Sequence, residues 1–291
     1  MKRVLFAVLM PIILLIPLCA QEVVRLGFIP GFSAVPFVHL MASADGGYTF
    51  TSYKAPSDVY RALRDGEIHA AIVPSSSAQK MLDASSGRLF VPCITRNTDF
   101  SVVSSEAEIR DFSTLLGKKV CVVPGSLAES FFRFLLQQGD VPVRQGDSGV
   151  ELVYEKNPAL IATGLLNGTF SAAVLGEPAL SALLSESKKM RDAIDLQDEY
   201  SKVVGAGRTV PLTVVVALTQ FRDEEPNAYQ TFLSALEASI QQIQANPALA
   251  AELSKSTDVQ FSSKSAVSAI KRANFSYIPQ KRPFSLRFST R

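Results

Sequence analysis

The sequence is poor in the residues from which metal, redox and disulfide sites are built. It has no tryptophan, three cysteines and two histidines in 291 residues. The cysteines, Cys19, Cys93 and Cys121, form no CxxC pair, and with only His39 and His69 they cannot make an all-protein Cys/His zinc site or a disulfide scaffold. An aromatic box for a flat cofactor would have to use the 18 Phe and 7 Tyr, which more often fill a core.

Sequence motifs of catalysis are also missing. The chain contains no GxSxG, GxGxxG, HExxH or phosphate-binding P-loop pattern. The two histidines are poorly placed for a Ser/His or Cys/His pair. We therefore expect a protein that is not an enzyme and that has no catalytic residues, cofactor or metal site.

Composition and charge indicate an ordinary globular protein of one or two domains. Hydrophobic residues make up 47% and charged residues 19% of the chain, which excludes disorder, collagen-like repeats and coiled coil. The 29 Lys and Arg nearly balance the 27 Asp and Glu. This neutral total gives no support to a nucleic-acid or membrane-surface partner.

The first 20 residues are typical of an export signal. Lys2 and Arg3 precede an apolar run of 15 residues, 4–18, which is shorter than the roughly 20 residues of a spanning helix. Cleavage after Ala20 would release a soluble periplasmic or otherwise extracytoplasmic protein. The alternative is lipid attachment at Cys19, because the segment loosely resembles a bacterial lipoprotein processing site.

Three pieces of sequence recur in the same order and indicate two lobes of one α/β design. The first pair ends in Pro-Gly, the second joins a strand to a helix, and the third carries a Leu-x-x-Gly motif followed by Ala-Ala. The matched pairs are 24–31 with 118–125, 53–56 with 155–158, and 63–72 with 165–174, at offsets of 94, 102 and 102 residues. Gly66 and Gly168 each follow a helix, where a left-handed backbone favours glycine.

Each copy alternates strands with helices, which predicts parallel βαβ units. Expected strands lie near 24–30, 48–54, 68–73, 89–95, 119–123, 150–154 and 171–175, and expected helices near 36–44, 57–65, 76–83, 126–138, 158–167 and 178–186. A strand near 210–219 and a long helical run over 225–253, broken at Asn246-Pro247, follow the repeat.

This order predicts two Rossmann-like lobes joined by a two-strand hinge. Lobe 1 would comprise residues 21–105 and 215–291, and lobe 2 residues 106–214. The chain would cross between the lobes near 101–117 and near 207–219, and paired crossings are what a hinge needs. From about Pro279 we expect a loosely held basic tail. We expect a monomer.

Candidate ligand-binding residues lie where strands end and helices begin, because open parallel sheets bind ligands beyond the carboxyl ends of their strands. Helix starts offer free N–H groups and a positive dipole end to an anion. The alternative is that the serines only cap their helices, and Ser126 with Glu129 has the spacing of a capping box. The candidates are Phe32, Ser33, Ala34, Ser75, Ser76, Ser77, Ser126 and Leu127.

Three further residues could contact a ligand. Glu177, in Gly-Glu-Pro at the end of a strand, could bind an ammonium or ring N–H, or it could be a solvated first-turn Glu. Arg96 and Asn97 follow a strand at the lobe junction and could clamp an acidic group, or Arg96 could be a plain surface residue. We expect structural roles for His39 and His69, and we expect Cys93 and Cys121 to be buried free thiols in different lobes.

The order of these motifs resembles that of the solute-binding proteins of the nitrate, sulfonate, taurine and thiamine-pyrimidine type. The similarity runs over residues 24–255 and rests on the motifs at 28–35, 63–71, 115–120, 165–178 and 246–251. His69 stands where the family commonly has an acidic residue. The lack of tryptophan disfavours a pyrimidine clamp, and the lack of a Cys-rich run disfavours the pyrimidine-synthesising enzymes of this fold.

The resemblance implies a type 2 periplasmic binding protein, whose two lobes close on a solute like a Venus flytrap and deliver it to the permease of an ABC importer. It also implies that the turns at 32–34, 75–77 and 126–128, together with Glu177, lie at the ligand. We expect the solute to be small and anionic or zwitterionic. The alternatives are an exported sensor or scaffold that presents its closed form to a receptor, and an exported enzyme on the same fold.

Overall fold

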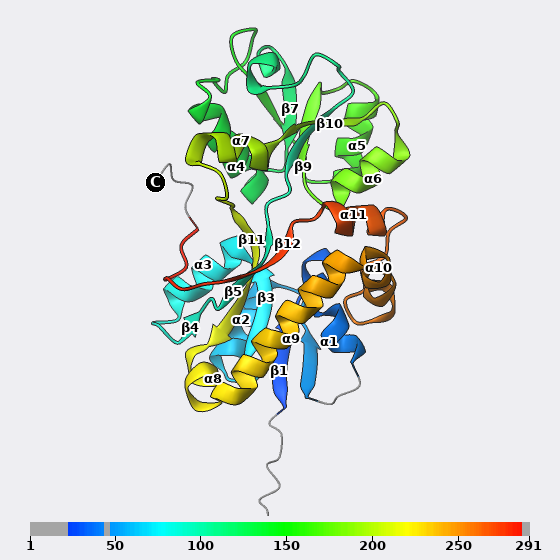
Figure 1. Ribbon diagram of the computed structural model, residues 1–291. Helices are drawn as coiled ribbons and strands as arrows, with labels where there is room; N and C mark the ends of the chain where they lie inside the picture. The colour runs from blue at the N-terminus through cyan, green and yellow to red at the C-terminus, as the bar shows by residue number, and fades with distance from the viewer. Residues whose placement is uncertain (1–22, 44–46, 287–291) are drawn as a thin grey trace, which may run out of the picture.

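The computed structural model describes residues 23–43 and 47–286, which form two α/β lobes (Figure 1). The expected two-lobe fold class is confirmed, because each lobe has its own sheet. The export signal expected over 1–20, with the lipidation candidate Cys19, lies outside the described residues. Within the described ranges, no helix has the length and apolar character that crossing a bilayer requires.

Lobe 1 is built on the large sheet, a seven-stranded mixed sheet in the order β12-β5-β11-β3-β1-β2, with β4 paired to the end of β11. Its strands are β1 (Val24–Phe28), β2 (Tyr48–Ser52), β3 (Ala70–Pro74), β4 (Leu89–Phe90), β5 (Cys93–Asn97), β11 (Pro211–Leu218) and β12 (Phe275–Pro279). β1 pairs in parallel with β2 and β3, whereas β11 runs antiparallel to β3 and β5.

Helices cover both faces of the large sheet. One face packs against η1 (Phe32–Phe37), α1 (Val38–Ala42), α8 (Thr219–Glu224), α9 (Pro226–Ala245), α10 (Pro247–Ser256) and α11 (Ala266–Arg272). The other face packs against α2 (Pro56–Arg64) and α3 (Ser75–Ala84). The long C-terminal helical region thus returns to lobe 1, as the sequence predicts, and breaks at Asn246.

Lobe 2 is built on the small sheet, five strands in the order β10-β6-β9-β7-β8. The strands are β6 (Ser101–Ser104), β7 (Lys119–Val122), β8 (Glu151–Tyr154), β9 (Ala172–Leu175) and β10 (Arg191–Asp195). One face is covered by η2 (Phe112–Leu115), α4 (Leu127–Gln138) and α7 (Leu196–Val204), the other by α5 (Pro158–Leu166) and α6 (Ala179–Glu186).

Strand registers confirm the internal repeat. Leu26 of β1 pairs with Ala70 of β3, and Val120 of β7 pairs with Ala172 of β9, both in parallel. These four positions are the ones that the offsets of 94 and 102 residues align. The two lobes therefore share a βαβαβ unit in which the first strand lies between the second and the third.

Alternate side chains of the central strands enter opposite cores, as expected for strands covered on both faces. In β7, Val120 and Val122 pack on the α4 side, whereas Cys121 packs on the α5 side. In β11, Val215 and Val216 divide in the same way between the two faces of the large sheet. Each lobe thus encloses two layers of apolar packing around its sheet.

Two short segments connect the lobes, between β5 and β6 at 98–100 and between α7 and β11 at 205–210. They lie side by side, because the Thr98 N–H donates to the Val210 carbonyl at 2.8 Å. The first crossing expected at 101–117 is wrong, since residues 101–104 already form β6 between β9 and β10. The second, expected near 207–219, is shorter and lies at 205–210, because residues 211–218 already form β11 of lobe 1.

The chain beyond Pro279 is better held than the sequence suggests. Its described part, residues 280–286, packs against the protein instead of hanging free, through Phe284 on lobe 1 and Leu286 on lobe 2. The expectation of a loosely held tail is therefore wrong for these residues. The basic and Ser/Pro-rich composition of this segment gave no indication that Phe284 and Leu286 pack against the cores.

Candidate functional site

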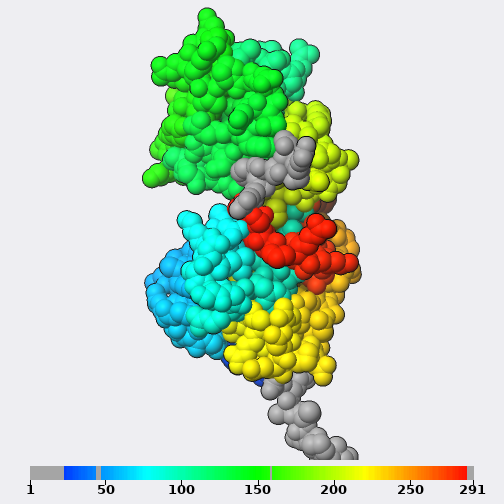
Figure 2. Space-filling view, turned by 90° about the vertical axis from the view of Figure 1, so that its left-hand side faces the viewer, coloured from blue at the N-terminus to red at the C-terminus, as the bar shows by residue number. Residues whose placement is uncertain are grey.

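The predicted ligand turns follow the carboxyl ends of β1, β3, β7 and β9. Figure 2 shows the surface hollowed between the lobes, with the green residues of lobe 2 above and the blue and cyan residues of lobe 1 below. Parallel strands that end at one edge place the following helix starts together. The geometry of each turn decides which of these starts is free to bind.

In the turn after β1, most of the predicted side chains are already buried against the rest of the protein. Of the three predicted residues, Phe32 and Ala34 are buried and Ser33 keeps part of its surface exposed. The Phe32 ring lies edge-on to Phe261 at 4.8 Å between centroids. The Arg96 guanidinium carbon lies 4.7 Å from the centre of the same ring, a distance that favours a cation–π contact.

The start of α3 is open. Ser75, Ser76 and Ser77 form its first turn, which has no side-chain cap and no acidic residue. Ser75 is fully buried, and its Oγ has no hydrogen-bond partner among the described residues. Ser76 is exposed and Ser77 partly exposed. This helix start therefore combines unpaired donors with a positive dipole end.

The start of α4 is closed by the chain itself. Ser126 caps the helix, its Oγ accepting from the Glu129 N–H at 3.1 Å, so the capping interpretation of this serine holds. The Glu129 carboxylate accepts from the Gly125 N–H at 2.7 Å and pairs with Arg133 at 2.9 Å. An anion at this helix start would meet a carboxylate already in place. Leu127 is partly buried beside this turn.

Glu177 also has its partners within the protein. Its side chain has no exposed surface, and Oε2 accepts from the Ser181 N–H of α6 at 3.2 Å. Oε1 pairs with the Arg272 Nε of α11 at 3.0 Å, and the same guanidinium pairs with Asp192 of β10. Arg272 belongs to lobe 1, so it joins the two lobes across their junction. Glu177 is therefore paired with a cationic side chain of the protein, Arg272, where the sequence suggested a cationic group of the ligand.

Arg96 and Asn97 are buried at the crossings instead of free in the junction. The Arg96 guanidinium donates to the Asp99 carboxylate at 2.6 and 2.9 Å and to the Glu177 carbonyl at 3.0 Å. The Asn97 amide donates to Ser276 Oγ at 2.8 Å and accepts from Thr209 Oγ1 at 2.9 Å. Both side chains hold strands, crossings and turns together.

Burial sets the electrostatics of this cluster. Desolvation raises the pKa of Glu177, opposed mainly by hydrogen bonds from Ser181 and less by Arg272. It likewise raises the pKa of Asp99 against the attraction of Arg96. A pocket of about 530 Å³ opens beside these groups and is lined by both lobes, including Asp195 and Lys271. The carboxylates outnumber the cations here, which makes this side of the junction acidic.

The predicted site residues thus divide into two groups. Phe32, Arg96 and Glu177 come together, because the guanidinium touches both the Phe32 ring of lobe 1 and the Glu177 carbonyl of lobe 2. Ser75–Ser77 and Ser126 lie at helix starts of opposite lobes. Sequence reasoning missed Arg272, 95 positions beyond Glu177, because no spacing motif links the two.

The histidines and cysteines take the structural places expected of them. His69 is buried in lobe 1, its Nδ1 accepting from the Arg25 N–H at 3.3 Å, and burial lowers its pKa to about 4. Cys93 and Cys121 are buried and free, one in each lobe, so the prediction of buried thiols is confirmed. Across the described residues, no group of His, Cys, Asp and Glu is arranged to hold a metal ion.

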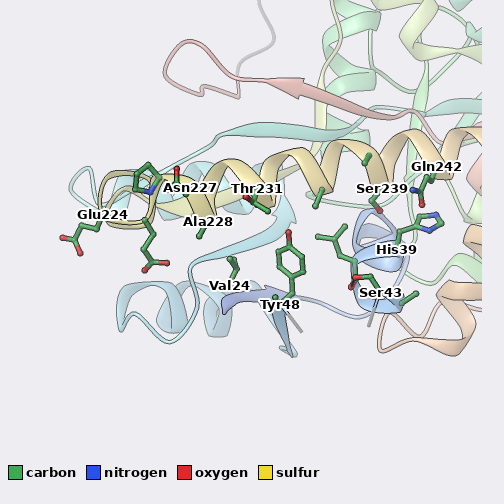
Figure 3. Close-up of a pocket in the computed structure, with 17 residues that line it drawn as sticks. Val24, His39, Ser43, Tyr48, Glu224, Asn227, Ala228, Thr231, Ser239 and Gln242 are labelled. Atoms are coloured by element: carbon green, nitrogen blue, oxygen red, sulfur yellow. Dashed lines mark hydrogen bonds between the residues drawn. The ribbon is translucent and has the colours of Figure 1, made fainter. Parts of the chain in front are cut away.

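A second hollow lies on lobe 1, away from the junction. This groove of about 1120 Å³ runs between α9 and the α1 and β2 region, and small residues of α9 form one wall (Figure 3). His39 and Gln242 lie at one end and Glu224 and Asn227 at the other (Figure 3). No sequence motif points to this surface.

The fold defines the class of protein: two α/β lobes joined by paired crossings form a type 2 periplasmic binding protein fold. The chain belongs to the NMT1/THI5-like family, whose model matches residues 49–250, more than half of the sequence. A comparison with curated protein sequences gave no match.

Solved structures share the fold at low sequence identity. An ABC transporter protein from Parabacteroides distasonis is 18% identical with a TM-score of 0.69, over 89% of this chain and 86% of that one. The periplasmic aliphatic sulphonate binding protein SsuA from Escherichia coli is 15% identical with a TM-score of 0.68, over 89% and 87%. A putative periplasmic sulfonate-binding SsuA from Methylobacillus flagellatus KT is 16% identical with a TM-score of 0.63, over 89% and 82%.

Proposed function

We propose that this protein is the extracytoplasmic solute-binding component of an ABC importer. It captures a small anionic or zwitterionic solute, of the sulfonate or taurine kind, by closing its lobes and presents it to a permease. Family membership, the two-lobe fold and the sulfonate-binding names of two structural neighbours support this function. We also propose that the protein works in the periplasm or another extracytoplasmic space, either as a soluble protein or anchored by a lipid at Cys19.

The observation that carries the proposal is the open start of α3. Its first turn offers backbone N–H groups and the hydroxyls of Ser75 to Ser77, with no capping side chain and no acidic residue. The unpartnered Oγ of Ser75 is a buried polar group whose hydrogen bond a ligand would complete. A sulfonate has three oxygens to accept such bonds, and the dipole of the 10-residue helix favours its charge.

Lobe 2 plays a different part, because its helix starts are already neutralised. Glu129 occupies the start of α4 and Glu177 the start of α6. We therefore assign the anionic group of the solute to lobe 1. Closure of lobe 2 would shield that group from water and strengthen its hydrogen bonds.

The test places a carboxylate of the protein where the anion of the solute should bind. We expect isothermal titration of the signal-less protein with taurine, methanesulfonate and nitrate to give saturable binding for at least one of them. In Ser76→Asp, the new carboxylate at the second position of α3 should weaken that binding at least 100-fold. The helix itself should keep its stability, because an acidic first-turn residue suits its dipole.

The matched control is Asn227→Asp, which adds one carboxylate at the second position of α9 in the same lobe. Asn227 lines the groove away from the junction, so this variant should bind as the wild type does (Figure 3). Binding that survives Ser76→Asp would show that α3 does not hold the anion. Absence of any binding or thermal stabilisation across the panel would overturn the choice of solute class.

A further inference from the structure

The C-terminal segment after β12 passes from one lobe to the other. The Gln280 N–H donates to the Pro92 carbonyl at 2.8 Å, which keeps the segment beside β5 of lobe 1. Phe284 then packs, partly buried, against the lobe 1 core formed by α2 and α3. Two residues later Leu286 packs, partly buried, against the lobe 2 core formed by α4 and α7.

A hydrogen bond fixes the segment at the point where it crosses. The Leu286 N–H donates to the Gln79 side-chain oxygen of α3 at 3.0 Å. Leu286 therefore contacts lobe 1 through its backbone and lobe 2 through its side chain. Figure 1 shows the red segment turning from β12 upward toward lobe 2, and Figure 2 shows it on the surface at the junction of the lobes.

We propose that residues 280–286 form a strap that restrains the lobes in the arrangement seen here and thereby regulates opening at the solute site. The proposal rests on the lobe movement of the proposed function. Rotation about the two crossings would move Gln79 away from the lobe 2 core. Leu286 could not then keep both its hydrogen bond to Gln79 and its packing on the lobe 2 core. Movement of the lobes therefore requires one of its two contacts to break.

The position of the strap connects it with solute binding. Gln79 lies one turn into α3, the helix whose start is assigned to the anion. The Arg272 contacts hold the lobes together at α11, whereas the strap acts at α3 and at the lobe 2 core. Release of the strap would leave the Arg272 contacts, the Arg96 bond to the Glu177 carbonyl and the two crossings to set the relative positions of the lobes.

The test compares Leu286→Asp with Ser285→Asp in the ligand-free full chain. Leu286 is partly buried at the lobe 2 core, whereas Ser285 is exposed, so both variants add the same charge and only one should lose the anchor. Trypsin cleavage after the exposed Lys281 reports release of the segment, and the radius of gyration from X-ray scattering reports separation of the lobes. We expect Leu286→Asp to be cleaved at least tenfold faster than the wild type and to have a larger radius of gyration. Ser285→Asp should match the wild type in both.

Two results would overturn the strap. One is an unchanged cleavage rate and radius in Leu286→Asp. The other is faster cleavage with an unchanged radius, which would show a bound segment that does not restrain the lobes. A chain that ends at Pro279 should stay folded by circular dichroism and repeat the scattering of Leu286→Asp. Neither readout needs a solute, so a failed titration with taurine and a failed strap are distinguishable.

Discussion

His69 shows at the scale of one residue how burial changes acid–base chemistry. Its ring stacks on Phe221 at 4.7 Å, its Nδ1 accepts from the Arg25 amide, and its side chain is 6% exposed. Desolvation, with a smaller contribution from the charge of Arg25, lowers its pKa from 6.5 to about 4. The folded protein therefore keeps His69 neutral at a pH where the unfolded chain would protonate it.

This shift predicts a loss of stability in mild acid. Below pH 6.5 the unfolded state binds a proton that the folded state refuses until about pH 4, so the free energy of unfolding falls as the pH drops through this range. Over this pH range, the shift in the pKa of His69 lowers the free energy of unfolding by about 3 kcal/mol. Because the chain has only two histidines, NMR titration of the untagged protein can follow both, with His39→Gln to assign them. A His69 midpoint near 6.5 would contradict the prediction.

Arg272 is the residue through which lobe 1 holds two carboxylates of lobe 2. Its replacement by Gln leaves the fully buried Glu177 side chain without its cation and removes the pair with Asp192. We expect the free energy of unfolding near pH 7 to fall by about 1–2 kcal/mol, at the low end for buried pairs because the Arg272 side chain is 39% exposed. Urea unfolding followed by circular dichroism measures this change.

Lys271→Gln provides the control for Arg272→Gln. The two residues are neighbours at the end of α11, and Lys271 is exposed. The lysine variant loses the same charge and should stay within about 0.5 kcal/mol of the wild type. Equal unfolding midpoints for the two variants would show that the Arg272 pairs contribute nothing measurable.

At the scale of an element, Asn246 determines where α9 ends and α10 begins. Its side chain accepts from the Leu249 N–H at 3.1 Å, and Pro247 starts α10 without needing an amide hydrogen. Asn246→Ala should therefore lower stability by about 1 kcal/mol in urea unfolding, the usual value for a lost N-cap. Gln241→Ala, an exposed change on α9, should have an effect below about 0.5 kcal/mol. Equal losses in both variants would contradict the capping role.

The elements of the repeat could be predicted because local rules decide them. β1 and β7 end in Pro-Gly turns, and Gly66 and Gly168 follow helices with φ of 72° and 76°. β10 and α7 escaped prediction, since the sequence of β10, Arg-Asp-Ala-Ile-Asp, carries little β preference. Its pairing with β6 on a sheet edge forms that strand. Tertiary context decided what local sequence did not.

The candidate site was partly predictable for the same reason. Helix starts after strands are visible in sequence, so Ser75–Ser77 and Ser126 were placed at their correct turns. Which start stays open depends on Glu129 and on partners far along the chain. Arg272 reaches Glu177 only through the return of α11 to the lobe junction. The residue types thus predict where the helix starts lie, whereas contacts with residues distant in sequence determine which helix starts are free to bind a ligand.

On the scale of the whole molecule, each lobe has its own hydrophobic cores, and the lobes contact each other over a small boundary. Phe232, on α9, is fully buried in lobe 1, and Phe132, on α4, is fully buried in lobe 2. Contacts between the lobes in the described part of the chain include two crossings of a few residues, the Arg272 pairs, the Arg96 bond to the Glu177 carbonyl and the Leu286 contact. Such an arrangement favours local opening of one lobe while the other stays folded.

Reciprocal core substitutions test this independence. Phe132→Ala and Phe232→Ala should each destabilise their own lobe by about 3–5 kcal/mol, because each removes a fully buried ring. Native-state hydrogen exchange should then show lower protection in β7 but not in β1 for Phe132→Ala, and the reverse for Phe232→Ala. If each variant lowered protection equally in both strands, the boundary would couple the lobes into one cooperative unit. In that case closure would have to move the lobes without loosening either core.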